Sequence, residues 1–243
     1  MKFYRILLLI GVLYFSFNNV QAQSFSEDVA KMLMYFEQLN NFELKVDVES
    51  FTAINDKQAA SELNMVFVIQ DDRYFMDYGL VKVIGTSESL LTIKDDSKLI
   101  VYAPIYHNPN NESKEGASEQ LDLAAAVAEI DSLQEQCERI TFKGVKAGLK
   151  IYELAYKQGL VERLTIHMDQ KTGALRKTIY EYDSSKYEGD QRVETTYWIK
   201  EDFDLLPAEQ FSACSYLDIQ SDKITGIGKY EDYNVFVNDS SRK

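Results

Sequence analysis

The stretch from Glu62 to Pro104 decides the fold, and its sequence is ELNMVFVIQDDRYFMDYGLVKVIGTSESLLTIKDDSKLIVYAP. Apolar residues fall on alternate positions in four short runs: Leu63, Met65, Phe67 and Ile69; Tyr74, Met76 and Tyr78; Leu91 and Ile93; Leu99 and Val101. Because successive side chains of a strand point to opposite faces, this pattern predicts several antiparallel strands that each bury one face. Nothing in the stretch offers a nucleophile, a metal-ligand cluster or a phosphate loop. The pattern therefore favours binding of an apolar ligand over catalysis.

Composition supports a globular chain with a sizeable core. The protein has 243 residues, of which 45% are hydrophobic, with only 3 Pro and 11 Gly. Its formal net charge is −13. Nucleic acids need a surface rich in Lys and Arg, so a nucleic-acid partner is excluded. The same charge disfavours electrostatic docking on anionic lipid.

The N-terminus has the pattern of a secretion signal. Lys2 and Arg5 precede an apolar run, and Val20-Gln21-Ala22 supplies small residues where a signal peptidase acts. The apolar run is short for a membrane span. We therefore expect residues 1–22 to be cleaved after Ala22, which would place the mature protein in the periplasm. An uncleaved anchor remains the alternative.

Cysteine and histidine are too few and too scattered for a metal site or a catalytic set. Cys137 and Cys214 form no CxxC pair, and a disulfide and two free thiols both remain open. His107 and His167 have no recognisable nucleophile motif beside them. The sequence therefore predicts a non-enzymatic protein without metal or cofactor.

Two amphipathic helices and a second set of strands complete the expected fold. The first helix follows the capping-box spacing of Ser24 and Glu27, and the second begins near Ser118. Apolar alternation resumes after Arg139, as the following runs illustrate: Ile140 and Phe142; Tyr152, Leu154 and Tyr156; Leu164, Ile166 and Met168; Val193, Tyr197 and Ile199. We predict a mainly β fold with α-helices over residues 23–243. In this single domain a strongly curved antiparallel sheet forms a half-open β-barrel around or beneath the helices.

Two hairpin motifs resemble those of a known family. DDSKLIVYAP at residues 95–104 is similar to the "D-G-x-x-hydrophobic-x-Y-x-P" signature of the periplasmic outer-membrane lipoprotein carrier family, LolA. IHMDQKTGALRK at residues 166–177 resembles that family's second hairpin, in which D-x-x-T-G precedes a basic strand. The order of signal, helix, strands, helical insert and strands also matches. The resemblance covers roughly residues 26–200.

The resemblance implies a LolA/LolB-like half-barrel that carries acylated lipoproteins toward the outer membrane. Its partners would be an acylated lipoprotein or another lipid, together with lipoprotein-sorting components of the inner and outer membranes. We expect a monomer. The family keeps an Arg on an early strand that helps control ligand release, and this chain has Phe75 there.

The predicted ligand cavity is lined by eight residues and covered by two more. The lining consists of Phe67, Tyr74, Met76, Tyr78, Leu91, Leu164, Ile166 and Met168, and the lid residues are Phe36 and Val127. Small ligands prefer apolar clefts of this kind. The alternative is an envelope interaction or sensor module in which the cavity has become a packed core.

Overall fold

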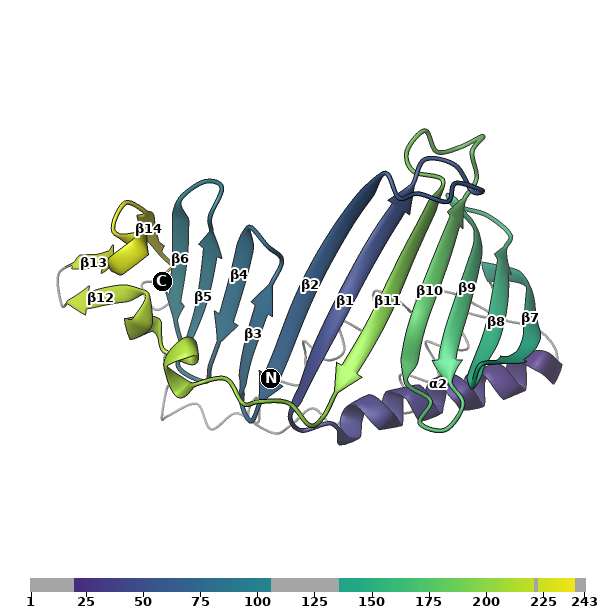
Figure 1. Cartoon of the computed structure of the whole chain (residues 1–243), viewed down its shortest axis with the longest axis horizontal. Helices are drawn as coiled ribbons and strands as arrows, with labels where there is room; N and C mark the ends of the chain where they lie inside the picture. Colours follow the sequence, from purple (N-terminus) through teal and green to yellow (C-terminus); the bar gives the residue numbers. More distant parts are fainter. Residues whose placement is uncertain (1–19, 106–135, 221–222, 239–243) are drawn as a thin grey trace. The chain divides into compact units, whose positions relative to one another are not determined.

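The computed structural model describes residues 20–105, 136–220 and 223–238 (Figure 1). The predicted helix near Ser118, the lid residue Val127 and most of the predicted signal peptide lie outside these ranges. The described helix is α2 (Val20–Gln38), and the short 3-10 turns are η1 (Ala208–Phe211), η2 (Ala213–Ser215) and η3 (Gly228–Tyr230). The strands are β1 (Phe42–Phe51), β2 (Ser61–Gln70), β3 (Arg73–Asp77), β4 (Val81–Gly85), β5 (Ser89–Lys94), β6 (Leu99–Pro104), β7 (Cys137–Lys146), β8 (Leu149–Tyr156), β9 (Val161–Asp169), β10 (Leu175–Tyr182), β11 (Arg192–Lys200), β12 (Leu217–Gln220), β13 (Lys223–Gly226) and β14 (Asn234–Val237).

The mainly β composition agrees with the prediction, and the start of the helix does not. Helix α2 begins at Val20, so Ser24 lies inside it and does not cap it. Among the described residues, no helix has both the length and the apolar character needed to cross a membrane.

The chain divides into two compact units, each built from separated segments. The first unit comprises Met1–Leu39, Val46–Leu63 and Ala117–Trp198. The second comprises Asn40–Lys45, Asn64–Gly116 and Ile199–Lys243. The sequence predicts a single domain and a half-open barrel. Both describe how the whole chain is arranged, and both stay predictions.

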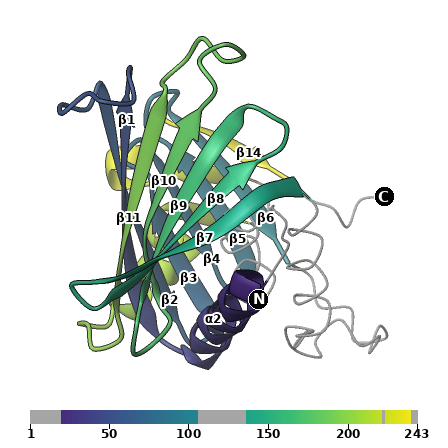
Figure 2. The ribbon, with the colours of Figure 1, turned by 90° about the vertical axis from the view of Figure 1, so that its right-hand side faces the viewer.

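The first unit contains an antiparallel meander with helix α2 on one face. Its strands follow the order β11-β10-β9-β8-β7. Tyr152 lies opposite Ile166, which lies opposite Thr178, and all three are buried. Helix α2 runs beside the strands of this meander (Figure 2). The ring of Phe25, on α2, meets that of Tyr152 at a centroid distance of 4.8 Å. The alternation predicted for this half of the chain is therefore confirmed.

The opposite face of this meander is polar. Arg163 pairs with Glu181 at 3.2 Å, and Arg192 pairs with Glu194 at 3.0 Å. Each of these ion pairs joins residues of the sheet on the face away from α2. The Arg163 side chain is 42% exposed, so solvent reaches its pair with Glu181, and such ion pairs contribute little to stability.

The second unit contains the sheet β14-β6-β5-β4-β3-β2, in which β14 runs parallel to β6 and the other neighbours are antiparallel. One face is covered by residues 206–220 and 223–233, which we call the C-terminal segment. The core between them contains Ile84, Leu91, Ile93 and Ile100 from the sheet and Phe211, Leu217 and Tyr230 from the segment. The segment is fastened by Leu206, whose backbone N–H donates to Gln70 Oε1 at 3.0 Å. Tyr233 also donates its hydroxyl to Asp95 at 2.9 Å.

Candidate ligand-binding face

The predicted cavity residues fall into two groups, one in each unit. Phe67, Tyr74, Met76 and Tyr78 belong to the second unit. Leu164, Ile166 and Met168 belong to the first unit, together with the lid residue Phe36. Each group is described by itself. That these residues line one ligand cavity stays a prediction.

In the second unit, strand register sets Phe67 in a row of side chains that crosses six strands. Neighbours in this central row are residues paired across adjacent strands: Phe67 (β2), Met76 (β3), Val83 (β4), Thr92 (β5), Val101 (β6) and Phe236 (β14). Paired residues in a sheet point to the same side. The central row therefore lies on one face, which we call the Phe67 face.

The Phe67 face is mostly apolar and largely half-exposed, whereas the centre of the opposite face is buried under the C-terminal segment. Along β5, Leu90 and Thr92 are half-buried, while their neighbours Leu91 and Ile93 are 1% and 0% exposed. Met76 is half-buried and Phe67 is 6% exposed. A contiguous apolar surface of this kind is a candidate for binding an apolar partner.

Aromatic side chains shape this surface. The rings of Phe67 and Tyr78 meet edge to face at 5.5 Å, and the Tyr78 hydroxyl donates to Met76 Sδ at 3.7 Å. Burial raises the pKa of Tyr78, so the phenol stays neutral. Tyr74 lies opposite Gly85, and a Cβ on that glycine would come within 2.1 Å of the Tyr74 ring. The ring thus lies over the glycine and covers the backbone of β4.

Leu91 departs from the expected lining. It pairs with Ile84, which pairs with Phe75, so all three lie on the face opposite Phe67. Leu91 is 1% exposed in the core beneath the C-terminal segment. The sequence analysis placed Leu91 in the lining, but Leu90 and Leu91 are both apolar, and only the register shows that Leu90 shares the face of Phe67. Phe75, the residue at the family's Arg position, also points away from the Phe67 face.

In the first unit the predicted lining residues are packed. Leu164, Ile166 and Met168 are 1%, 3% and 1% exposed. The buried apolar residues of α2 in the described part of the helix are Phe25, Val29, Met32 and Leu33, whereas Phe36 is half-buried. The face is therefore a closed core in this conformation.

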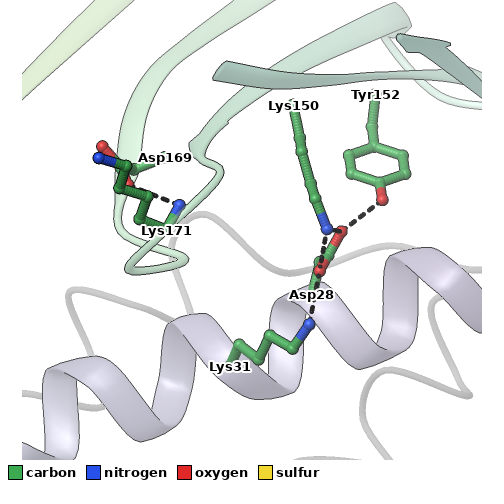
Figure 3. Close-up of polar contacts among 6 residues, drawn as sticks. All are labelled: Asp28, Lys31, Lys150, Tyr152, Asp169 and Lys171. Atoms are coloured by element: carbon green, nitrogen blue, oxygen red, sulfur yellow. Dashed lines mark hydrogen bonds and ion pairs between the residues drawn. The ribbon is translucent and has the colours of Figure 1, made fainter. Parts of the chain in front are cut away.

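A buried carboxylate anchors α2 to this sheet. Lys150 Nζ lies 2.7 Å from both oxygens of Asp28, and the Tyr152 hydroxyl donates to Asp28 Oδ2 at 2.6 Å (Figure 3). Lys31 Nζ lies 3.5 Å from Oδ1. Burial by itself would raise the pKa of Asp28, but the hydrogen bonds from Lys150 and Tyr152 outweigh it and hold that pKa below its usual range. Sequence reasoning missed this anchor, although its signal is visible: Asp28 is an acid within the apolar stripe of the helix.

The second unit also contains two open grooves, both beside the C-terminal segment. One, of about 420 Å³, is lined by residues including Arg73, Tyr102 and Phe211. The other, of about 500 Å³, is lined by residues including Phe75 and Tyr216. Neither contains a residue of the predicted ligand lining.

The cysteines and the potential metal ligands in the described ranges form neither a disulfide nor a metal-ligand cluster. Cys137 and Cys214 are both free, which answers the question that the sequence left open. Burial raises the pKa of Cys137 to about 12, so its thiol is inert at neutral pH. No three His, Cys, Asp or Glu side chains gather as metal ligands among the residues that the structure describes.

Comparison with known proteins finds likeness in structure alone. No protein-family model and no curated protein matches the sequence. An uncharacterized conserved protein from Thermus thermophilus is 8% identical, with a TM-score of 0.44 over 88% of this chain and 99% of that chain. The MucA/MucB complex of Pseudomonas aeruginosa gives 10% identity and a TM-score of 0.40 over 77% of this chain and 60% of the matched chain. A LolA superfamily protein from Nitrosomonas europaea is 12% identical, with a TM-score of 0.28 over 80% of this chain and 98% of that chain.

Proposed function

We propose that the protein is an exported, non-enzymatic carrier or chaperone that shields acyl chains of a lipid or lipoprotein in the periplasm, during transfer toward the outer membrane. The observation that supports this proposal is the Phe67 face. Apart from Thr92 its central row is apolar, and from Met76 to Phe236 the row is partly exposed. The centre of the other face is buried under the C-terminal segment. Each methylene group removed from water on such a surface is worth about 0.8 kcal/mol.

Side-chain chemistry on this face suits ligands of variable shape. Met76 is unbranched and polarizable, so it adapts to different chains. The Phe67 and Tyr78 rings present rigid apolar area beside it. A carrier must also release its cargo, and a half-open face meets that need better than a sealed cavity.

The test is binding of a fluorescent fatty acid and of a triacylated peptide to the purified chain. We expect binding that Met76→Asp abolishes, because the new carboxylate would lie in the central row. Leu80→Asp is the matched control, since Leu80 is 61% exposed in the turn after β3 and lies outside that row. If neither probe binds the unaltered protein, the proposed function is wrong.

The packed core of the first unit favours a second candidate function, an envelope interaction or sensor module. There the residues expected to line the cavity are at most 3% exposed, which leaves them no room for an acyl chain. Mass spectrometry of material co-purified with the protein from the cell envelope separates the two candidates. A lipid or lipoprotein supports the carrier, whereas a protein partner without lipid supports the module.

A further inference from the structure

The C-terminal strand β14 adds an element to the Phe67 face. It pairs in parallel with β6, with Asn234 opposite Leu99, Phe236 opposite Val101 and Val237 opposite Tyr102. In this register Phe236 points to the same side as Val101 and ends the central row. The contribution comes from a strand more than 130 residues downstream of β6, so no local pattern reveals it.

The exposures along β14 differ by face. Val235 packs against the core under the C-terminal segment. Phe236, on the Phe67 face, is 60% exposed, and Val237, on the opposite face, is 38% exposed. A phenyl ring left open at the end of an apolar row offers contact area that the chain itself does not use.

The row is long enough to hold one acyl chain. Six strands are separated by five steps of about 4.8 Å, so the row spans about 24 Å from Phe67 to Phe236. The acyl chains of one bilayer leaflet fill about 15 Å when fluid, half of the hydrocarbon core, and reach further when extended. Without β14 the row would have four steps, or about 19 Å. Strand β14 thus lengthens the row at the end where a long chain would finish.

We propose that one acyl chain lies across the strands along the central row, and that Phe236 contacts its far end and sets the preferred chain length. This inference rests on the proposed function, because it requires acyl chains to bind to the Phe67 face. The edge-to-face pair of Phe67 and Tyr78 marks the other end of the row. Short chains would fill the row between these ends without reaching β14.

The test measures displacement of a fluorescent fatty acid from the full chain by saturated fatty acids with 10, 14 and 18 carbons. We expect Phe236→Ser to weaken binding of the longest acid about tenfold, since this equals the loss of fewer than two buried methylene groups. Binding of the 10-carbon acid should not change. Val237→Ser is the matched control, because it changes an exposed apolar residue of the same strand on the opposite face, and it should leave all three affinities unchanged.

Phe236→Trp is a second test variant, in which the contact area at this position is enlarged and not removed. The larger ring should strengthen binding of the 18-carbon acid and leave the 10-carbon acid as it is. The inference is overturned if the unaltered chain binds fatty acids but the two Phe236 variants bind all three acids with the same affinities as Val237→Ser. If the unaltered chain binds none of the acids, the proposed function fails and this inference fails with it.

Discussion

Tyr74 and Gly85 show how a single pair of residues can shape the candidate site. The space where a Cβ of residue 85 would stand is occupied by Cε1 and Cζ of Tyr74, each at 2.1 Å. These are outer atoms of a side chain, so Gly85→Ala would move the ring rather than the backbone. We expect a loss of about 1 kcal/mol in the free energy of unfolding, at the low end for overpacking. Urea titration measures it, and the double change Gly85→Ala with Tyr74→Leu should recover part of the loss.

Asp28 makes the attachment of α2 depend on pH. Its pKa is lower in the folded chain than in the unfolded chain because Lys150 and Tyr152 hold the charged form. The stabilisation is therefore complete above the unfolded value of about 3.9 and is lost as the pH falls through the folded pKa. We expect Asp28→Asn to lower the free energy of unfolding by about 2 kcal/mol at pH 7. This difference should shrink as the pH is lowered below about 4.

Chemical denaturation at pH 7 and at several acid pH values tests this prediction. Lys31→Gln serves as the control, because the Lys31 side chain is 63% exposed and lies 3.5 Å from the carboxylate. Exposed ion pairs contribute at most about 1 kcal/mol to the free energy of unfolding. An Asp28→Asn variant that is as stable as the unaltered chain at pH 7 would show that α2 is held by apolar packing alone.

At the scale of elements, the C-terminal segment is part of the core of the second unit. Phe211 is 2% exposed and packs in the cluster that contains Ile84, Leu91 and Ile93. The Arg73 guanidinium also lies 4.9 Å from the centre of its ring. We expect Phe211→Ala to reduce the free energy of unfolding by about 3–5 kcal/mol, as is usual for a buried Phe. Ile219→Ala, at a position that is 39% exposed, should change it by less than about 0.5 kcal/mol.

The elements that could be predicted are those whose periodic pattern is long enough. Strands such as β2 and β9 have four and three alternating apolar residues, and both form where expected. Strand β4 was not predicted because Leu80, Val81, Val83 and Ile84 place apolar residues on both faces. Strands β12 and β13 have four residues each, too few for a recognisable pattern.

The candidate site could be predicted only in part, because register is a property of pairing and not of local sequence. Phe67, Tyr74, Met76 and Tyr78 share one face, since their alternation continues through a tight turn, and their role as a ligand lining stays a prediction. Leu91 was assigned to the wrong face, and Phe236 was missed because a parallel pairing with β6 has no short-range signal. Asp28 was overlooked because its partners lie 122 and 124 residues away.

At the scale of the whole molecule, the net charge limits how the proposed carrier could exchange its cargo at a membrane. The chain has 39 acidic and 26 basic residues and a net charge of −13. An anionic membrane surface attracts basic segments, worth about 1 kcal/mol per Lys or Arg, and repels a chain of this charge. A carrier of this composition therefore has no electrostatic means of settling on anionic lipid. Exchange of cargo would then depend on an acceptor protein or on acyl chains presented to the Phe67 face.

Flotation with lipid vesicles tests this consequence. We expect no co-flotation with vesicles rich in phosphatidylglycerol at low salt, where unscreened repulsion is strongest. Vesicles of phosphatidylcholine serve as the control, because they carry no net charge and should retain no more protein when salt is added. Binding to the anionic vesicles that weakens as salt is raised would contradict the prediction, since it would reveal a basic surface strong enough to overcome the net charge. Absence of binding to both vesicles, together with uptake of a triacylated peptide from solution, would place the handover step on protein partners.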